Sequence, residues 1–327
     1  MQQRRLGSNG KSVGAVGFGC MSFAGMYGAT DMAESHAALA KALELGVTHL
    51  DTALIYGDGV SEQVIGAFIK DHPGRFSIAT KGGIRTGPTR EFDNSEAYLR
   101  ECVEGSLQRL GVDHVDLYYI HRRDQRIPIE DVTGTLARFV EEGKIGGIGY
   151  SEISPASLQR AAAVHPVMAV QSEYSLWTRL PELGMLQACK RMGTAFVAFS
   201  PVARGMFGRA LPDPAVFAEE AFRGHNPRFS EPNFGFNAAY FERFSEYAAG
   251  KGLSPATLAI AWVLHQGDHI IPIPGTRSAA HLEEDAAADA VKLTAQDVAE
   301  IEAILPAGFA HGARYSDGQS NGPEDYC

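Results

Sequence analysis

Residues 47–56, VTHLDTALIY, begin as a buried strand and then place an acid and a phenol just past the apolar part. Val47 and Leu50 have the apolar character of a strand core, but burial gives no reason for Asp51 or Tyr56. Polar residues at this position are informative in a parallel sheet, because binding and chemistry gather at the carboxyl ends of its strands. A parallel sheet is therefore predicted only if such an apolar run with polar residues after it recurs along the chain.

The pattern of a short apolar run followed by a helical segment recurs along the chain. The eight apolar runs are VGFGC (16–20), VTHLD (47–51), FSIAT (76–80), VDLYYI (115–120), IGGIGYS (145–151), VMAVQ (167–171), TAFVAFS (194–200) and HIIPIPG (269–275). Several helical segments end at glycines where we expect left-handed C-caps, namely Gly46, Gly111, Gly143, Gly193 and Gly267. Such alternation indicates a parallel sheet covered on both faces, and eight units predict an α/β fold of the (β/α)8 TIM barrel type. A doubly wound open sheet is the alternative.

Three peripheral segments lie outside this alternation. Residues 1–14 contain an Asn-Gly turn and predict a β-hairpin ahead of the first strand, placed to plug the bottom of the barrel. Residues 201–237 form a long loop after the seventh strand, rich in Phe, Pro and Gly, which we expect to shape the pocket or fold over a ligand. A disordered excursion is the alternative. The polar tail, residues 306–327, either reaches the pocket or stays mobile. Without a repeat or low-complexity linker, residues 1–327 are expected to form one domain.

Composition and charge exclude several classes of protein. A net charge of −10 and a pI near 5.6 argue against a general nucleic-acid surface. The four cysteines have no CxxC spacing, so neither a disulfide framework nor a zinc site is predicted. No apolar stretch is long enough to span a bilayer, and the first residues lack the apolar core of a signal peptide. We expect a cytoplasmic protein without membrane or nucleic-acid partners; a monomer is the expected state, although the sequence does not define it.

Four proton-transferring side chains follow the second, third and fourth strands. Asp51 and Tyr56 follow the second, Lys81 the third and His121 the fourth. Taken singly, each also has an ordinary structural explanation: a helix cap, a half-buried ring, a solvated strand end or a satisfied histidine. Together, at the carboxyl ends of neighbouring strands, they are our candidate catalytic residues.

Several motifs of the chain resemble those of the aldo-keto reductase family, in order and in spacing. They are LDTALIYG, IATKGG, DLYYIHR, GKIGGIGYSE, VQSEYSL and IPIPGTR. The glutamate after Ser151 is similar to the bacterial and plant reductases of that family rather than to the aldose reductase type. The resemblance implies a barrel that binds NADP(H) and reduces a small-molecule aldehyde or ketone.

The four strand-end residues suit that reaction. Tyr56 is the candidate acid that gives a proton to the developing alkoxide, and a nearby Lys81 ammonium would lower the pKa of its phenol. Asp51 would keep that lysine charged and in place. His121 would donate to the carbonyl oxygen and orient the substrate. The hydride comes from the cofactor, so no metal is expected.

The cofactor residues are implied by the resemblance. Ser151 and Gln171 would contact the nicotinamide carboxamide, and Phe199 would stack on the nicotinamide ring. At the other end of the cofactor, Gly275, Thr276 and Arg277 would contact the adenosine phosphate, and Glu284 would contact the adenine. Glu152 stands where the aldose reductase type has an asparagine, Gly275 where that type has a lysine, and His281 where an arginine or glutamine is common. Arg277 therefore carries most of the expected 2'-phosphate contact.

Other functions remain as alternatives. The sequence has no GxGxxG, so a bound dinucleotide would not be held in the Rossmann manner. A metal-dependent barrel hydrolase would require that the resemblance mislead, since no HExxH occurs. An NADP(H)-binding regulatory or redox-sensing protein on the same fold, like the potassium channel beta subunits, is the main alternative to the enzyme. The sequence does not predict which aldehyde or ketone is reduced, nor the preferred direction.

Overall fold

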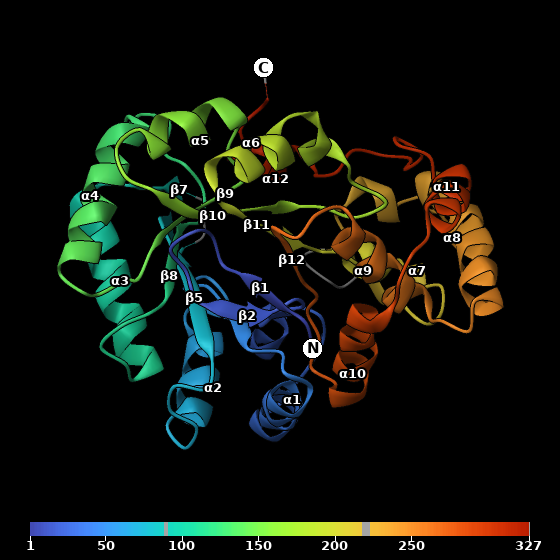
Figure 1. Cartoon of the computed structure of the whole chain (residues 1–327), viewed down its shortest axis with the longest axis horizontal. Helices are drawn as coiled ribbons and strands as arrows, with labels where there is room; N and C mark the ends of the chain where they lie inside the picture. The colour runs from blue at the N-terminus through green and yellow to red at the C-terminus, as the bar shows by residue number, and fades with distance from the viewer. Residues whose placement is uncertain (88–90, 218–222, 327) are drawn as a thin grey trace.

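Eight short parallel strands form a barrel in the computed structural model, which describes residues 1–87, 91–217 and 223–326 (Figure 1). In spatial order they are β3 (Phe18–Gly19), β4 (His49–Asp51), β5 (Ser77–Gly82), β8 (Leu117–Ile120), β9 (Ile148–Ser151), β10 (Val167–Glu173), β11 (Ala195–Phe199) and β12 (Ile270–Ile273). The first and last strands meet, because the N–H groups of Gly17 and Gly19 donate to the carbonyls of Pro272 and Pro274, each at 2.9 Å. The predicted barrel is confirmed, and an open sheet is excluded.

Gly275, which stands where the aldose reductase type has a lysine, lies at the seam of the barrel. Gly19 and Gly275 form the parallel bridge at the seam. A methyl group on Gly275 would lie 3.0 Å from the Gly19 carbonyl oxygen, which is tighter than most real contacts. A side chain at position 275 would therefore crowd the strand pairing that closes the barrel.

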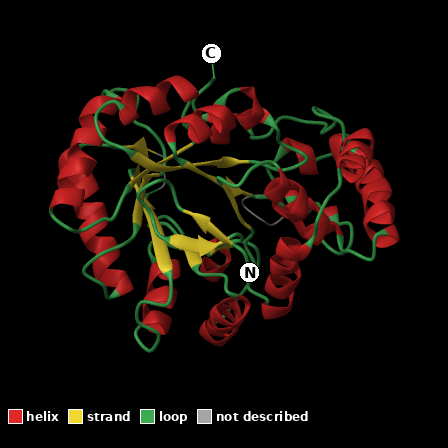
Figure 2. Cartoon of the chain, in the orientation of Figure 1, coloured by secondary structure: helices red, strands yellow, loops and turns green. Residues whose placement is uncertain are grey.

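Helices surround the strands, as Figure 2 shows. Those that follow the barrel strands are α1 (Met32–Leu45), α2 (Val60–Ile69), α3 (Glu96–Leu110), α4 (Ile129–Glu141), α5 (Pro155–Ala162), α6 (Met185–Met192), α9 (Pro255–His265) and α10 (Ala279–Ala286). Several begin at a polar cap, and Asp31, Ser95 and Ser154 each accept a hydrogen bond from the backbone N–H three residues later.

Four of the five glycines expected to end helices have left-handed backbones. Gly46, Gly111 and Gly193 are C-caps with φ of 75°, 68° and 66°, and Gly143, with φ of 73°, directly follows the cap of α4. The prediction for Gly267 is wrong. Helix α9 ends at His265 and its C-cap is Gln266, in a right-handed conformation, while the Gly267 carbonyl accepts hydrogen bonds from Arg4 and from the Ile270 N–H.

Further elements lie in the connections and after the last barrel strand. They are β6 (Ile84–Arg85), β7 (Glu91–Phe92), α7 (Pro214–Phe217), α8 (Asn233–Gly250), α11 (Ala295–Ile304), α12 (Asp317–Ser320) and the short 3-10 turns η1 (Met21–Ala24), η2 (Leu180–Leu183), η3 (Ala203–Gly205), η4 (Pro227–Phe229) and η5 (Ala287–Ala290). The expected 201–237 loop thus contains several helical turns, and its end belongs to α8; residues 218–222 of it lie outside the described residues.

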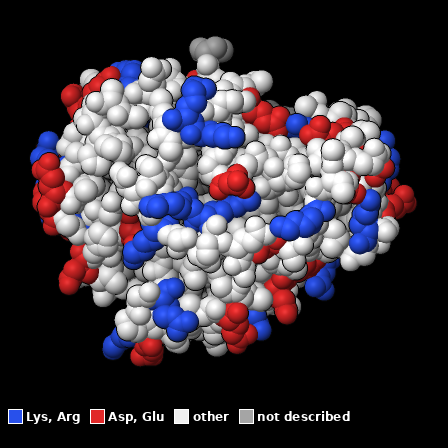
Figure 3. Space-filling model, in the orientation of Figure 1, with Lys and Arg blue, Asp and Glu red and all other residues white. Residues whose placement is uncertain are grey.

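The predicted N-terminal hairpin consists of β1 (Gln3–Arg5) and β2 (Ser12–Gly14) and lies across the centre of the barrel in Figure 1. Leu6 and Val13 are fully buried against residues of the barrel interior. The Ser8 N–H donates to the Gly193 carbonyl at 2.7 Å, just ahead of β11. The hairpin therefore covers the amino ends of the strands. Figure 3 shows this face, where Lys and Arg side chains gather near the middle.

Gly7 in the hairpin turn provides a test of this packing. Its φ is +72°, and a methyl group there would lie 2.3 Å from the Met168 carbonyl oxygen of β10. Gly74 has a matching φ of +70° but nothing within 4 Å, so Gly74→Ala measures backbone strain alone. We expect Gly74→Ala to lower the free energy of unfolding by about 1–2 kcal/mol, and Gly7→Ala by about 2 kcal/mol more. Equal losses in chemical denaturation would show that the turn is not packed on β10.

Candidate active site at the carboxyl ends of the strands

A buried ion pair joins two neighbouring strand ends. Lys81 on β5 contacts Asp51 at the end of β4, and the two side chains are 0% and 2% exposed. Lys81 Nζ also donates to the Thr52 carbonyl at 2.9 Å, while Gln171 Nε2 donates to Asp51 Oδ2 at 2.6 Å. Both carboxylate oxygens of Asp51 are therefore used, and the lysine is held at a defined position.

Tyr56 lies above this pair. It follows β4 in a tight turn, and its hydroxyl is 3.4 Å from Lys81 Nζ. The ring meets the His121 imidazole edge to face, with centroids 5.9 Å apart and an angle of 86°. The structure thus brings together all four side chains that the sequence singled out.

Burial and charge act in opposite directions on this cluster. Burial raises the pKa of Tyr56 overall, although the Lys81 ammonium lowers it. The predicted influence of Lys81 therefore has the expected sign but is smaller than the effect of burial. Burial also opposes the charge of Lys81, but Asp51 and Tyr56 outweigh it and raise the pKa of the lysine. Near neutral pH the phenol is protonated and the lysine charged.

Two predicted cofactor residues, Ser151 and Gln171, each use part of their hydrogen-bonding groups within the protein and keep one for a ligand. Ser151 Oγ, at the end of β9, accepts from Arg122 Nη1 at 2.9 Å, so its own O–H is available to donate. Gln171 uses its amide N–H toward Asp51, which leaves its carbonyl oxygen to accept. Phe199 ends β11 and is partly buried against the barrel interior. One donor and one acceptor therefore stand side by side.

The remaining predicted cofactor residues follow β12. Arg277 Nη1 donates to the Tyr27 carbonyl at 2.5 Å, and Thr276 Oγ1 accepts from the Ser278 N–H at 3.0 Å. Glu284 on α10 pairs through Oε2 with Arg209 at 2.6 Å. Its other oxygen, Oε1, is buried and has no hydrogen-bond partner among the described residues. Such an oxygen is suited to accept from a bound ligand.

Comparison with known proteins identifies the family. A sequence model described as the Aldo/keto reductase family matches residues 15–306. The chain belongs to the aldo/keto reductase family. It is 40% identical over 322 residues to a probable aldo-keto reductase 1 from Glycine max, covering 97% of this chain and 93% of that protein.

Solved structures of the same family share the fold. A glycerol dehydrogenase from Gluconobacter oxydans matches with a TM-score of 0.85 and 27% identity, over 93% of this chain and 94% of that chain. An aldo-keto reductase from Klebsiella pneumoniae in complex with NADPH matches with a TM-score of 0.75 and 24% identity, over 97% of this chain and 99% of that chain. The chain is thus an oxidoreductase of the aldo/keto reductase family on a TIM barrel.

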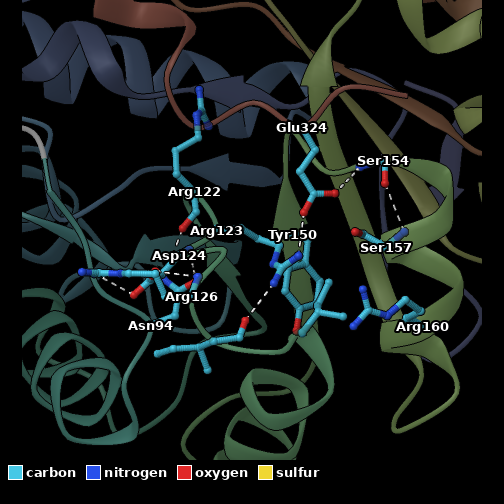
Figure 4. A network of polar contacts seen from close by, with 12 residues as sticks. Asn94, Arg122, Arg123, Asp124, Arg126, Tyr150, Ser154, Ser157, Arg160 and Glu324 are labelled. Atoms are coloured by element: carbon cyan, nitrogen blue, oxygen red, sulfur yellow. Dashed lines mark hydrogen bonds and ion pairs between the residues drawn. The ribbon is translucent and has the colours of Figure 1, made fainter. Parts of the chain in front are cut away.

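The C-terminal tail of this family member docks at the mouth of the barrel. Both carboxylate oxygens of Glu152 accept from the Arg314 guanidinium. Further along, Glu324 accepts from Arg123 at 2.8 Å and from the Ser154 N–H at 2.9 Å, as Figure 4 shows. Of the two alternatives left by the sequence, the described part of the tail takes the first and reaches the site.

Buried charges near the tail were not predicted. Glu173 at the end of β10 pairs with Arg204 at 2.6 Å, and both side chains are almost fully buried. The Arg204 guanidinium lies over the ring of Tyr315 in the tail, 4.8 Å from its centroid. Glu152 itself has an unusual φ of 57° directly after Ser151. In the sequence, only its position after Ser151, a predicted nicotinamide residue, marked Glu152.

The described residues were also compared with the side-chain groups typical of metal sites and with the length of a membrane-spanning helix. Outside the short gaps in the description, His, Cys, Asp and Glu side chains form no group of three that could hold a metal ion. Among the same residues, every helix is too short or too polar to span a bilayer. Cys20, Cys102 and Cys189 are buried free thiols, whereas Cys327 lies outside the described residues.

Glu324 is the testable anchor of the tail. Burial raises its pKa, but bonds from Ser154, Ser157 and Arg123 outweigh that and lower it, so the anchor is charged at neutral pH. Losing its charge-assisted bonds should increase transient opening of the tail about 10- to 100-fold. We expect Glu324→Gln to speed limited proteolysis within residues 306–326 accordingly, with sites read by mass spectrometry.

Asp325 is the matched control for this experiment. It is the next residue, is exposed, and Asp325→Asn makes the same change of charge. That variant should be cleaved at the wild-type rate. Equal cleavage of all three proteins would show that Glu324 does not anchor the tail.

Proposed function

We propose that this chain reduces an aldehyde or ketone to the alcohol, reversibly, with NADPH as reductant and Tyr56 as the proton donor. The observation that carries the proposal is the buried Lys81–Asp51 pair, with Lys81 Nζ 3.4 Å from the Tyr56 hydroxyl oxygen. A structural ion pair needs no phenol at that distance, whereas an acid that must become a tyrosinate during the reaction does need a fixed positive charge.

The residues of the barrel mouth fit NADP(H). Ser151 offers an O–H and Gln171 a carbonyl oxygen, which match the oxygen and the amino group of a carboxamide. Phe199 provides a flat apolar surface for the ring. Gly275, Thr276 and Arg277 would hold the adenosine phosphate, and the unpartnered oxygen of Glu284 would accept from the adenine amino group. When bound, NADPH supplies the hydride.

The chain's own residues then account for the proton. Because burial raises the pKa of Tyr56, the hydroxyl is protonated before reaction and can donate to the developing alkoxide. Lys81 stabilises the tyrosinate that remains, and Asp51 keeps the lysine in place. His121, in edge-to-face contact with the Tyr56 ring, is positioned to donate to the same oxygen and to orient the carbonyl.

The proton donor is tested by removing one oxygen atom. Tyr56→Phe should lower kcat for NADPH oxidation with a panel of aldehydes by about 10² to 10⁴, with the Kd for NADPH nearly unchanged. Tyr119→Phe is the control, because that ring also lies near Lys81 Nζ, 5.7 Å from its centroid, and should keep most of the activity. Substantial turnover by Tyr56→Phe would remove the tyrosine from the mechanism. No turnover by wild type with any aldehyde would favour a nucleotide sensor.

Cofactor choice is tested at Arg277. A guanidinium that faces a 2'-phosphate can make two charge-assisted hydrogen bonds, each worth roughly 1.5–3 kcal/mol. Wild type should therefore prefer NADP(H) over NAD(H) by about one to three orders of magnitude in Kd. Arg277→Ala should weaken NADP(H) and spare NAD(H), which serves as the internal control. Equal weakening of both nucleotides would show that Arg277 only covers the rim of the loop.

A further inference from the structure

Arg122, directly after His121, is a buried cation that is only partly satisfied. Its side chain is 7% exposed. Nη1 makes both of its hydrogen bonds, to the His121 carbonyl at 2.6 Å and to Ser151 Oγ at 2.9 Å. Nε is fully buried and has no partner, and Nη2 has no hydrogen bond either within the part of the chain that the structure describes. The edge formed by Nε and Nη2 therefore lacks a hydrogen-bond partner among these residues.

That edge is the one with which other arginines of this chain hold carboxylates. Arg160 binds both oxygens of Glu130 through Nε and Nη2, at 2.7 and 2.8 Å. Arg126 binds Asp124 through the same two atoms, at 2.8 and 3.0 Å. Arg122 forms no ion pair with any carboxylate of residues 1–87, 91–217 and 223–326.

Neighbouring arginines at the mouth of the barrel differ in this respect. Arg123 is paired with Glu324, Arg204 with Glu173 and Arg314 with Glu152. A buried guanidinium without an anion carries a desolvation cost that such pairing offsets. The vacant edge of Arg122 is thus matched in chemistry to an anion that the chain does not supply.

The contacts of Arg122 place its guanidinium beside the candidate active site, because Nη1 bonds to the His121 carbonyl and to Ser151 Oγ. Figure 4 shows Arg122 pointing away from the Asn94, Asp124 and Arg126 cluster, whereas the next residue, Arg123, points toward Glu324. A methyl group on Gly322 of the tail would lie 3.1 Å from Arg122 Cδ, so the tail covers the apolar stem of this side chain. Burial raises the pKa of Tyr56, and Arg122 is among the cations that oppose that rise.

The phosphates of a bound nucleotide are not the matching anion. Arg122 follows β8, and the loop that contains Arg277 follows β12. In the closed barrel these strands are four apart in either direction, through β9, β10 and β11 or through β5, β4 and β3. The adenosine phosphate loop is therefore on the opposite side of the barrel from Arg122.

We propose that Arg122 binds a carboxylate carried by the carbonyl substrate, so that the enzyme prefers oxo acids to uncharged aldehydes. This inference rests on the proposed function. The two open N–H groups would form a bidentate pair with the carboxylate, as Arg160 does with Glu130. The pair would hold the substrate with its carbonyl toward Tyr56 and His121, and Arg122 would be a specificity-determining residue.

Matched substrate pairs test the proposal. Succinic semialdehyde is compared with butanal, and 4-carboxybenzaldehyde with 4-methylbenzaldehyde, in wild type, Arg122→Met, Arg122→Lys and Arg126→Met. We expect Arg122→Met to lower kcat/KM for the carboxylated member about 10²-fold more than for the uncharged member, mainly through KM. Arg122→Lys keeps the charge without the fork and should lose about tenfold. Arg126→Met, which removes a paired and mostly exposed guanidinium, should keep the wild-type ratio.

A binding measurement separates this inference from the proposed function. The Kd of butanoate for the enzyme with bound NADP⁺ needs no turnover; it should rise about 10²-fold in Arg122→Met, while butanamide binds both proteins equally. An equal loss for both members of each substrate pair, together with weaker NADPH binding, would show that Arg122 acts only through Ser151 and would overturn the proposal. Unchanged butanoate binding would overturn it as well. Absence of turnover with every aldehyde would instead contradict the proposed function.

Discussion

The ion pair between Lys81 and Asp51 is the interaction on which the site depends. Both side chains are buried, and a buried ion pair adds little net stability to a fold. Loss of either partner leaves an unpaired buried charge, which costs about 3–5 kcal/mol. The chain meets that demand with the Gln171 amide on one side and the Thr52 carbonyl on the other. Such a pair is difficult to explain by stability alone. Its value lies in a fixed positive charge beneath a phenol.

The barrel is what makes this arrangement possible. Parallel pairing sets Asp51 of β4 opposite Ala79 of β5, and Lys81 follows two residues later on the same face of the strand. Tyr119 on β8 stands opposite Lys81, and the centroid of its ring lies 5.7 Å from Lys81 Nζ. Closure at Gly19 and Gly275 holds the strand ends in one ring. The same closure brings Ser151 and Gln171 within reach of the pair.

Local patterns in the sequence predicted the strands and the four side chains at their ends, because apolar runs and the residues that follow them are neighbours in the chain. They could not predict contacts that join distant segments. Arg123 and Glu324 are 201 residues apart, and Arg314 and Glu152 are 162 apart, so no periodicity links them. The sequence could not predict that Nε of Arg122 lacks a partner either, because that depends on where the fold places every carboxylate. The net rise in the pKa of Tyr56 was missed because burial depends on the whole fold.

The pH dependence of alcohol oxidation in Lys81→Met tests the central claim most directly. In the proposed mechanism, alcohol oxidation requires the tyrosinate as base, and removing the Lys81 ammonium raises the pKa of the phenol. The acidic limb of kcat/KM against pH should therefore move to higher pH in Lys81→Met. Asp51→Asn, which keeps Lys81 and removes a carboxylate that raises the pKa of the phenol, should not reproduce that shift. Circular dichroism and NADPH binding establish that both variants are folded. A limb that stays at its wild-type pH in Lys81→Met would mean that another group titrates, and would contradict the account.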